Sequence, residues 1–406
     1  MAITDKKTGV WGLDQVFNKI NQGSIWDYAG MANLFMWGHN DNGNLGQNQS
    51  PGTLDSGSSP VQIPGSWAAH YKGYSLTNFA VKTDGTAWVW GANGNGVFGT
   101  NQTSGESHSP IQIGTDTTWS TEQGKYNCAT NNACSSIKAD GTLWWWGSSV
   151  HGYDGTSNGS DTEAYRRSSP VQVGSDSTWV ILANDGGYGQ NLATKTDGTL
   201  WSWGYNARGG LGQNNRTLYS SPIQIPGTTW STEPQKLVAS GQGGVLAIKT
   251  DGTLWSWGDN QRGQLGQNST AHKSSPVQVP GTTWKFVGGR SHIRNAIKTD
   301  GTLWAWGSNT SGSLGQGNTT DYSSPVQVGS DTTWTHCECF DFDSGAGGMM
   351  ATKTDGTLWM WGDNEYGGLG QNNRTDYSSP KQIPGTLWSG ETLTSGKRTS
   401  SCIQAD

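Results

Sequence analysis

The sequence predicts an all-β fold: a seven-bladed β-propeller of four-stranded antiparallel blades, preceded by a short helical extension. Three observations predict it: a Trp-Gly dipeptide that recurs along the chain, an Asp-Gly turn at a fixed distance before it, and chain ends that complement each other. Gly (61 residues) and Trp (23 residues) are abundant, although only 32% of the 406 residues are hydrophobic. This composition is typical of many tight turns between short strands that bury large rings.

The Trp-Gly dipeptide marks the repeating unit. It recurs at intervals of 49 to 57 residues, at Trp37, Trp90, Trp146, Trp203, Trp257, Trp306 and Trp361. The Asp of an Asp-Gly turn stands six residues before each of the last six, at Asp84, Asp140, Asp197, Asp251, Asp300 and Asp355. With a second tryptophan two residues before the dipeptide and a third at the end of each unit, 20 of the 23 tryptophans occupy repeat positions. This period indicates an array of equivalent units whose tryptophans form the core.

One unit, residues 236–279, shows how each blade is expected to fold. Four short strands are predicted, at 236–240, 245–250, 253–258 and 274–279. Asp-Gly between two alternating strands is a strong hairpin signal, because both turn residues tolerate a positive φ. Trp255 and Trp257 are two residues apart, so they share one face of the sheet and can pack against a neighbouring blade.

The two ends of the chain are expected to build one blade together. Residues 392–406 align with 237–251, the first two strands of a unit, and residues 31–38 align with 251–258, which contains the third strand. Pairing of the C-terminal strand with the N-terminal one closes the ring and removes the exposed edges of an open array. Six whole units and two halves therefore predict seven blades over residues 31–406.

The units resemble regulator-of-chromosome-condensation repeats, which share the order D-G, x-x-W-x-W-G, N-x-x-G-x-L-G and S-S-P seen here. The resemblance covers about residues 31–406 and implies a seven-bladed propeller. The name-giving eukaryotic member is a nucleotide-exchange factor for a small GTPase, but it relies on a basic tail and a protruding wedge, and neither is evident in this sequence. Bacterial propellers of the family bind or inhibit protein partners.

The turns after the first and third strands vary between units, whereas the Asp-Gly turn hardly varies. In an up-and-down blade these variable turns emerge on one face, and Tyr and Arg at their tips are typical interface anchors. The candidate partner-binding face comprises Tyr71, Tyr74, His151, Tyr153, Tyr165, Arg166, Asp185, Tyr188, Arg290, His292, Asp341 and Asp343. The alternative is that these loops vary freely because they carry no packing.

Composition and charge disfavour several classes of partner. The net charge is −6, the pI is near 5.6, and no basic patch or stripe is visible in the sequence, so nucleic-acid binding is not expected. No apolar run is long enough for a membrane span, and the first residues lack the apolar segment of a secretory signal. We therefore expect a product made and folded in the cytoplasm.

The sequence offers no convincing metal, cofactor or catalytic site, and we expect a non-enzymatic protein without a cofactor. The His-Cys-Glu-Cys segment at 336–339 lacks a second ligand pair for zinc, so its two cysteines are expected to be buried as small hydrophobic residues. Cys128 and Cys134 face each other across a predicted hairpin, but free thiols are expected in a chain folded inside a cell. The D-N-x-x-G segments at Asp259 and Asp363 lack the bidentate Glu of a calcium loop.

Residues 1–30 lie outside the predicted ring and form a candidate docking segment. An amphipathic helix is predicted from apolar residues at i, i+3, i+4 and i+7, bracketed by two tryptophans; the segment's apolar residues are Trp11, Leu13, Val16, Phe17, Ile20 and Trp26. The pattern G-V-W-x-L-x-x-V-F…G-S-I-W is similar to the openings of structural proteins from tailed phages, although Asp27 stands where a Pro often follows.

Two functional hypotheses follow. The first is a phage virion component, a fibre, decoration or tail protein, which is made in the host cytoplasm and resides in the virion. Residues 1–30 would bind other virion proteins, and the chain could also form a homo-oligomer. The variable face would bind a host surface protein or glycan, or would stabilise the particle. The alternative is a bacterial interaction protein whose propeller binds or inhibits a protein partner.

Overall fold

The computed structural model describes residues 34–401 except 41, 50–55, 73–76, 123, 131–132, 150–151, 153, 157–165, 185–188, 241–242, 342–346, 366–368, 372, 387, 389–393 and 397–398. These residues form β-strands and connecting loops, with no α-helix among them, which confirms the all-β prediction. They build six four-stranded antiparallel sheets and two two-stranded ones. The predicted helix and docking segment of residues 1–30 lie outside the described residues, so that domain boundary stays a prediction.

Each four-stranded sheet, or blade, takes its strands from consecutive stretches of chain. In the first three blades the strands are β3 (Trp67–Lys72), β4 (Thr77–Lys82), β5 (Ala87–Ala92), β6 (Glu106–Gln112); β7 (Tyr126–Thr130), β8 (Ala133–Ile137), β9 (Leu143–Ser148), β10 (Arg166–Gln172); β11 (Trp179–Asn184), β12 (Gln190–Lys195), β13 (Leu200–Gly204) and β14 (Tyr219–Ile225). In the next three they are β15 (Leu237–Ser240), β16 (Gly244–Ile248), β17 (Leu254–Gly258), β18 (Lys273–Gln278); β19 (Trp284–Arg290), β20 (Ile293–Lys298), β21 (Leu303–Gly307), β22 (Tyr322–Gln327); β23 (Trp334–Asp341), β24 (Gly347–Lys353), β25 (Leu358–Gly362) and β26 (Tyr377–Gln382). The two-stranded sheets pair β1 (Leu34–His39) with β2 (Ser56–Ile63) and β27 (Thr394–Gly396) with β28 (Thr399–Ser401).

The Asp-Gly turn is fixed by a short chain of hydrogen bonds. In the β15–β18 blade, Oδ1 of Asp251 accepts from the backbone N–H (2.9 Å) and the hydroxyl (2.6 Å) of Thr253, and that hydroxyl accepts from the indole N–H of Trp255 (2.9 Å). Gly252 supplies the positive φ of +77° that the turn requires. The bonds from Thr253 hold the pKa of Asp251 below its ordinary value. The same three-residue arrangement recurs in the other five blades, which explains why this turn hardly varies.

A lysine beside each Asp-Gly turn is held between two indole rings. Nζ of Lys298 lies 4.7 Å from the ring centroid of Trp284 and 4.3 Å from that of Trp304, a cation–π geometry. Equivalent lysines occupy the same place in the other blades, at Lys82, Lys138, Lys195, Lys249 and Lys353. In three blades an aspartate also pairs with this lysine, at Asp116, Asp176 and Asp331. These lysines are therefore structural.

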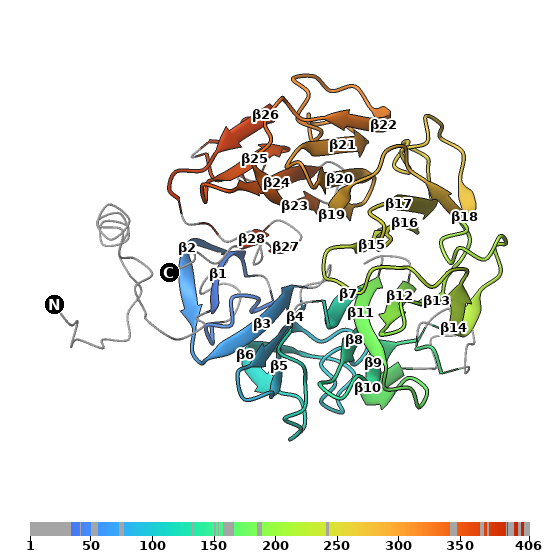
Figure 1. Cartoon of the computed structure of the whole chain (residues 1–406). Coiled ribbons are helices and arrows are strands. Elements are labelled where there is room, and N and C mark those ends of the chain that lie inside the picture. Colours follow the sequence, from blue (N-terminus) through green and yellow to red (C-terminus); the bar gives the residue numbers. More distant parts are fainter. Residues whose placement is uncertain are drawn as a thin grey trace.

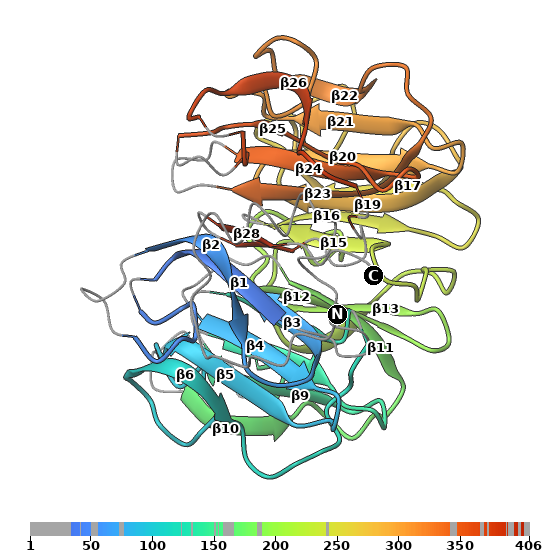
Figure 2. The same cartoon turned by 90° about the vertical axis from the view of Figure 1, so that its left-hand side faces the viewer.

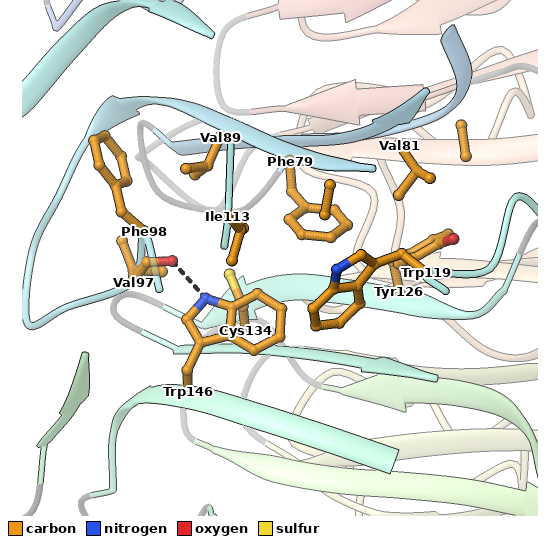
Figure 3. Close-up of a cluster of buried hydrophobic side chains, with 12 residues drawn as sticks. Phe79, Val81, Val89, Val97, Phe98, Ile113, Trp119, Tyr126, Cys134 and Trp146 are labelled. Atoms are coloured by element: carbon orange, nitrogen blue, oxygen red, sulfur yellow. Dashed lines mark hydrogen bonds between the residues drawn. The ribbon is translucent and has the colours of Figure 1, made fainter. Parts of the chain in front are cut away.

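In five of the repeats the tryptophan of the Trp-Gly dipeptide joins two blades. Trp306 is fully buried, and its indole N–H donates to the carbonyl of Gln264 in the preceding blade (2.9 Å). Figure 3 shows the equivalent bond from Trp146 to the carbonyl of Val97, next to the ring of Phe79. The same bond recurs at Trp90, Trp257 and Trp361. The predicted packing of these rings against a neighbouring blade is thus confirmed.

The sheets are arranged around a common centre with their first strands innermost (Figure 1). β27 lies against β23 and β3, and β28 lies beside β1 in both views (Figures 1 and 2). The terminal strands therefore lie near each other. The backbone pairings of the described residues do not join β28 to β1, however, so the count of seven blades and the closure of the ring stay predictions.

The cysteines divide into two groups. Cys337 and Cys339 are buried and form no disulfide, as expected from their place in an inner strand. The expectation of a free thiol is wrong for Cys134, which is disulfide-bonded. The hairpin of β7 and β8 pairs Asn127 with Ser135, and Cys128 follows Asn127 on that strand. Facing residues of an antiparallel pair have the Cα separation that a disulfide needs.

Candidate protein-binding face

The propeller has two faces that differ in construction. We call the loop face the side that carries the turns between first and second strands and the loops between third and fourth strands. The Asp-Gly face is the opposite side. On the loop face, the long loop of each blade bonds to the start of the fourth strand in the next, as in Asn214 N–H to Ser274 O (2.7 Å) and Asn268 N–H to Ser323 O (2.8 Å). Variable segments of consecutive blades therefore lie side by side.

The structure describes some of the candidate residues on this face. Arg166 begins β10, Arg290 ends β19, and His292 lies in the turn that follows, so all three border the loop face. Tyr71 and Asp341 lie at the same ends of β3 and β23, with their backbones alone described. The other candidates lie outside the described residues: Tyr74, His151, Tyr153, Tyr165, Asp185, Tyr188 and Asp343. A binding role for these residues stays a prediction.

A buried asparagine holds the long loop of most blades. In the β15–β18 blade, Oδ1 of Asn260 accepts from the N–H of Leu265 (2.9 Å), and Nδ2 donates to the carbonyls of Ser269 (2.8 Å) and Ala271 (3.0 Å). The same pattern recurs at Asn206, Asn309 and Asn364. Because the loop frame is fixed, side chains that differ between blades occupy equivalent places. For example, the residue two positions after the asparagine is Arg208 in the first of these blades, Arg262 in the second and Ser311 in the third.

A buried carboxylate lies at the centre of this region. Asp259 has no exposed surface, and Oδ2 accepts from Gln264 Nε2 (2.6 Å). Two histidines flank it: Nδ1 of His272 lies 3.2 Å from Oδ1, and Nε2 of His292, from the next blade, lies 3.6 Å from Oδ2. Burial lowers the pKa of both histidines although Asp259 acts in the opposite direction. Both rings are therefore neutral at neutral pH.

Arg294 is the cation buried beside this carboxylate. It lies on β20 and is 0% exposed; its Nη1 donates to the carbonyls of Ser291 (2.9 Å) and Ile293 (2.8 Å), while Nε and Nη2 have no hydrogen-bond partner in the structure. Burial lowers its pKa to about 10 against the opposing charge of Asp259, so it remains protonated at neutral pH. Arg294 occupies the position on the second strand that pairs with the tryptophan of the Trp-Gly dipeptide. In the other blades this position holds an uncharged residue: Asn78, Cys134, Asn191, Val245 or Met349.

Further arginines extend this polar region across the blades. Nη1 of Arg208 lies 2.9 Å from Nε2 of His272, and Nη1 of Arg262 lies 3.6 Å from Oδ2 of Asp321; each contact links adjacent blades. Arg216 also acts electrostatically on His272, and Arg262 and Arg294 act on His292. We call the set on the three consecutive blades from β11 to β22 the arginine cluster; its members are Arg208, Arg216, Arg262, Arg290 and Arg294.

The electrostatic interaction of Arg290 with Glu338 extends this polar region to β23, the first strand of the next blade. Glu338 of β23 is half-buried, and burial raises its pKa to about 7, against the opposing charge of Arg290. Neighbouring Phe286 of β19 and His336 of β23 stack with centroids 5.0 Å apart. The polar region thus continues from the β19–β22 blade to the β23–β26 blade.

The structure brings together arginines that form no basic stretch in the sequence. All eight arginines in the described part of the chain lie in loops or strand ends that border the loop face: Arg166, Arg167, Arg208, Arg216, Arg262, Arg290, Arg294 and Arg374. They are scattered along the sequence, so only the folding of the repeats brings the five cluster members together. The signal that sequence reasoning missed is the N-x-R-G pattern, which occurs at 206–209 and again at 260–263.

The described residues show little else that resembles a small-molecule or metal centre. They contain no group of three or more His, Cys, Asp or Glu side chains arranged to hold a metal ion. A cavity of about 640 Å³ runs along the outer side between β10 and β14, and Arg167, Lys195 and Trp201 are among its lining residues. The described residues contain no helix with the length and apolarity to cross a bilayer.

The repeat family is recovered by comparison with family models. The model described as "Regulator of chromosome condensation (RCC1) repeat" matches residues 197–248, 251–292, 300–340 and 355–388, and a second model of the same description matches 236–264. These matches include every member of the arginine cluster except Arg294, which lies between two matched segments.

Known proteins of this kind are similar to much of the chain. The ultraviolet-B receptor UVR8 of Arabidopsis thaliana is 26% identical over 63% of this chain and 55% of its own length, so the match spans little more than half of that relative. Human RCC2 is 37% identical over 90 residues, 22% of this chain and 17% of its own. Human WBSCR16 has a similar fold, with a TM-score of 0.72 and 18% identity over 92% of this chain and 100% of that one. Prp20p of Saccharomyces cerevisiae gives a TM-score of 0.70 and 17% identity over 93% of each chain.

The virion hypothesis gains no support from these comparisons. It depends on residues 1–30, which lie outside the described residues. Neither the family models nor the relatives reported above are virion proteins. The virion location and the contacts with virion proteins or a host glycan therefore stay predictions from the sequence.

Proposed function

Because the chain belongs to the regulator-of-chromosome-condensation repeat family of β-propellers, we propose that it is a binding protein whose loop face holds a protein partner. The observation that carries the proposal is the difference between its two faces. The Asp-Gly face repeats the same turn and the same lysine in every four-stranded blade. The loop face carries different side chains on each blade over a fixed backbone frame.

The physical contrast supports a partner site on the loop face. On the Asp-Gly face, the aspartates accept bonds within their own turns, and the lysines lie between indole rings. On the loop face, Arg262 has 55% of its side chain exposed, and Arg216 is exposed. Arginine is enriched at protein interfaces because its planar fork combines hydrogen bonding with stacking.

The relatives support binding in preference to catalysis. Prp20p, which shares the fold, is described together with its binding properties to Gsp1p and histones, and another structure holds yeast RCC1 bound to Kap60. The match to human HERC2, an E3 ubiquitin-protein ligase, covers only 5% of that protein. We therefore propose a binding role and no catalytic activity for this chain.

Charge reversal on the loop face is expected to abolish capture of the partner. The test uses the tagged full chain in lysate of the cells that produce it, as wild type, as Arg208→Glu/Arg262→Glu, and as the control Lys285→Glu/Lys381→Glu. Both variants change the net charge equally, but the control residues are exposed away from the loop face. Capture of a protein by the wild type should fall at least tenfold with the arginine variant and persist with the lysine variant. The reason is that glutamates in place of arginines put like charges against partner groups that contact a cation, and such contacts cost several kcal/mol.

Folding of each variant is checked by circular dichroism and by its thermal midpoint. Loss of the captured protein with the lysine variant and its retention with the arginine variant would place the partner elsewhere and refute the proposal.

A further inference from the structure

We propose that the partner contacts the arginine cluster through an acidic segment, a stretch of protein with several Asp or Glu side chains. The inference rests on the proposed function and adds the chemistry of the partner. Its basis is a local excess of positive charge in a chain whose net charge is −6.

The excess is confined to the loop face of the three blades from β11 to β22. The described residues there include six cations, Arg208, Arg216, Arg262, Lys273, Arg290 and Arg294. They include only two anions, Asp259 and Asp321. Asp259 is fully buried and bonded to Gln264, and Asp321 accepts from the N–H of Asn309 (2.8 Å) beside Arg262. Arg216 and Arg262 are exposed, and their guanidinium groups extend this surface beyond the two carboxylates.

The type of cation indicates carboxylate as the ligand. A guanidinium presents several N–H groups in a planar fork that matches a carboxylate bidentately, whereas an ammonium acts as a point charge. In the described part of the chain arginine is confined to the loop face, while the recurrent lysines support the Asp-Gly turns. The Arg262 guanidinium contacts Asp321 through Nη1 at 3.6 Å and is largely exposed, so it retains N–H groups for a partner.

Buried groups beneath the surface hold this arrangement in place. The ring of His272 lies between Arg208 and Asp259, and His292, in the turn that follows Arg290, approaches Asp259 from the next blade. Arg294 adds a positive charge from a site of low dielectric, where its field is screened less than that of an exposed residue. Preorganised cations of this kind lose little side-chain entropy on binding.

A protein segment fits these observations better than a nucleic acid. Proteins that bind phosphate backbones use lysine and arginine over an extended basic surface. Here the cluster ends at the next blade, where exposed Glu365 and Asp376 border Arg374. A short acidic segment can lie on three blades without approaching those carboxylates, whereas a long polyanion would meet them.

The sequence supplies a matched pair of arginines for a test. Gln-Asn-Asn-Arg-Thr occurs at 213–217, within the cluster, and at 371–375, outside it. Both copies make the same loop bonds. The second asparagine donates to a tyrosine hydroxyl, Asn215 to Tyr219 at 3.1 Å and Asn373 to Tyr377 at 2.9 Å. Its side-chain oxygen accepts from the threonine N–H, at 2.8 Å from Thr217 and at 2.9 Å from Thr375. Arg216→Glu and Arg374→Glu therefore change the same residue in the same local structure, and differ in whether it belongs to the cluster.

The experiment measures fluorescence anisotropy of a labelled decaglutamate peptide against the full chain at low salt, with decaglutamine and a 20-nucleotide single-stranded DNA as comparison probes. Wild type should bind decaglutamate at least tenfold more tightly than decaglutamine. Arg216→Glu should weaken that binding about fivefold, the upper end for one exposed ion pair, and Arg374→Glu by less than twofold. Raising the salt concentration should weaken it further.

Three outcomes would overturn the inference. Equal weakening by the two variants would mean attraction without a site, and tighter binding of the DNA probe with the same dependence on Arg216 would assign the cluster to nucleic acid. Absence of decaglutamate binding while Arg208→Glu/Arg262→Glu still abolishes capture of the natural partner would reject the acidic segment and leave the proposed function standing. Binding of decaglutamate by a chain whose captured partner is insensitive to the loop face would instead reject the proposed function.

Discussion

Replacing Trp306 by alanine is expected to lower the free energy of unfolding by about 3–5 kcal/mol, the usual cost of removing a fully buried indole. The ring fills the space between two blades: it packs against Trp284 with centroids 6.2 Å apart and shares a core with Leu246 and Val279 of the preceding blade. Its loss also removes the donor to the carbonyl of Gln264. Urea denaturation of the full chain, followed by tryptophan fluorescence and circular dichroism, measures the change.

Two further substitutions separate the contributions at this position. Trp306→Phe keeps most of the apolar volume but removes the N–H donor, so its cost should lie below that of the alanine variant. Trp304→Ala removes a half-buried ring that stacks on Lys298 and should also cost less. If Trp306→Ala proved no more destabilising than Trp304→Ala, the account of the interface between blades would be wrong.

Asp259→Ala is expected to lower the free energy of unfolding by about 1–3 kcal/mol, because it removes a fully buried carboxylate whose negative charge partly offsets the burial of the Arg294 cation. It also removes the acceptor for Gln264 Nε2 and the anion beside His272. The measurement is again the urea midpoint and slope of the full chain. Capture of the partner should fall as well, since the carboxylate positions both histidines beneath the arginine cluster.

A second variant tests whether the cost arises from the stranded charge. Asp259→Ala combined with Arg294→Met removes both charges and replaces the cation by an apolar side chain of similar length. The double variant should be more stable than Asp259→Ala alone, because it also removes a buried cation whose Nε and Nη2 have no hydrogen-bond partner. Equal or lower stability of the double variant would contradict the electrostatic explanation.

The fold could be predicted because its determinants are local and recur. Asp251, Thr253 and Trp255 lie within five residues, so the hydrogen bonds that fix the Asp-Gly turn are encoded in one short pattern. The Trp-Gly tryptophans appear at a regular period, which identified them as core. The predicted strands of residues 236–279 agree with β15 to β18 to within two residues at each end.

The arginine cluster could not be predicted in the same way because its contacts cross between blades. Arg208 and His272 are 64 residues apart, and neither lies in a motif that suggests a site. Asp259 drew notice in the sequence only as a faint calcium loop, whereas the structure buries it between two histidines. The sequence showed which turns vary, but not that the longest of them, at residues 146–170, lies outside the three blades where the arginines gather.

Photo-cross-linking tests the central claim, that the loop face holds the partner, most directly. A photoreactive phenylalanine derivative is placed at Ala207 or Gln261, exposed neighbours of Arg208 and Arg262, and at Thr228 or Thr282, exposed on the Asp-Gly face. Irradiation of the purified variants in lysate of the producing cells should link the same protein to positions 207 and 261 and nothing to 228 and 282. Products formed only from positions 228 and 282 would contradict the account.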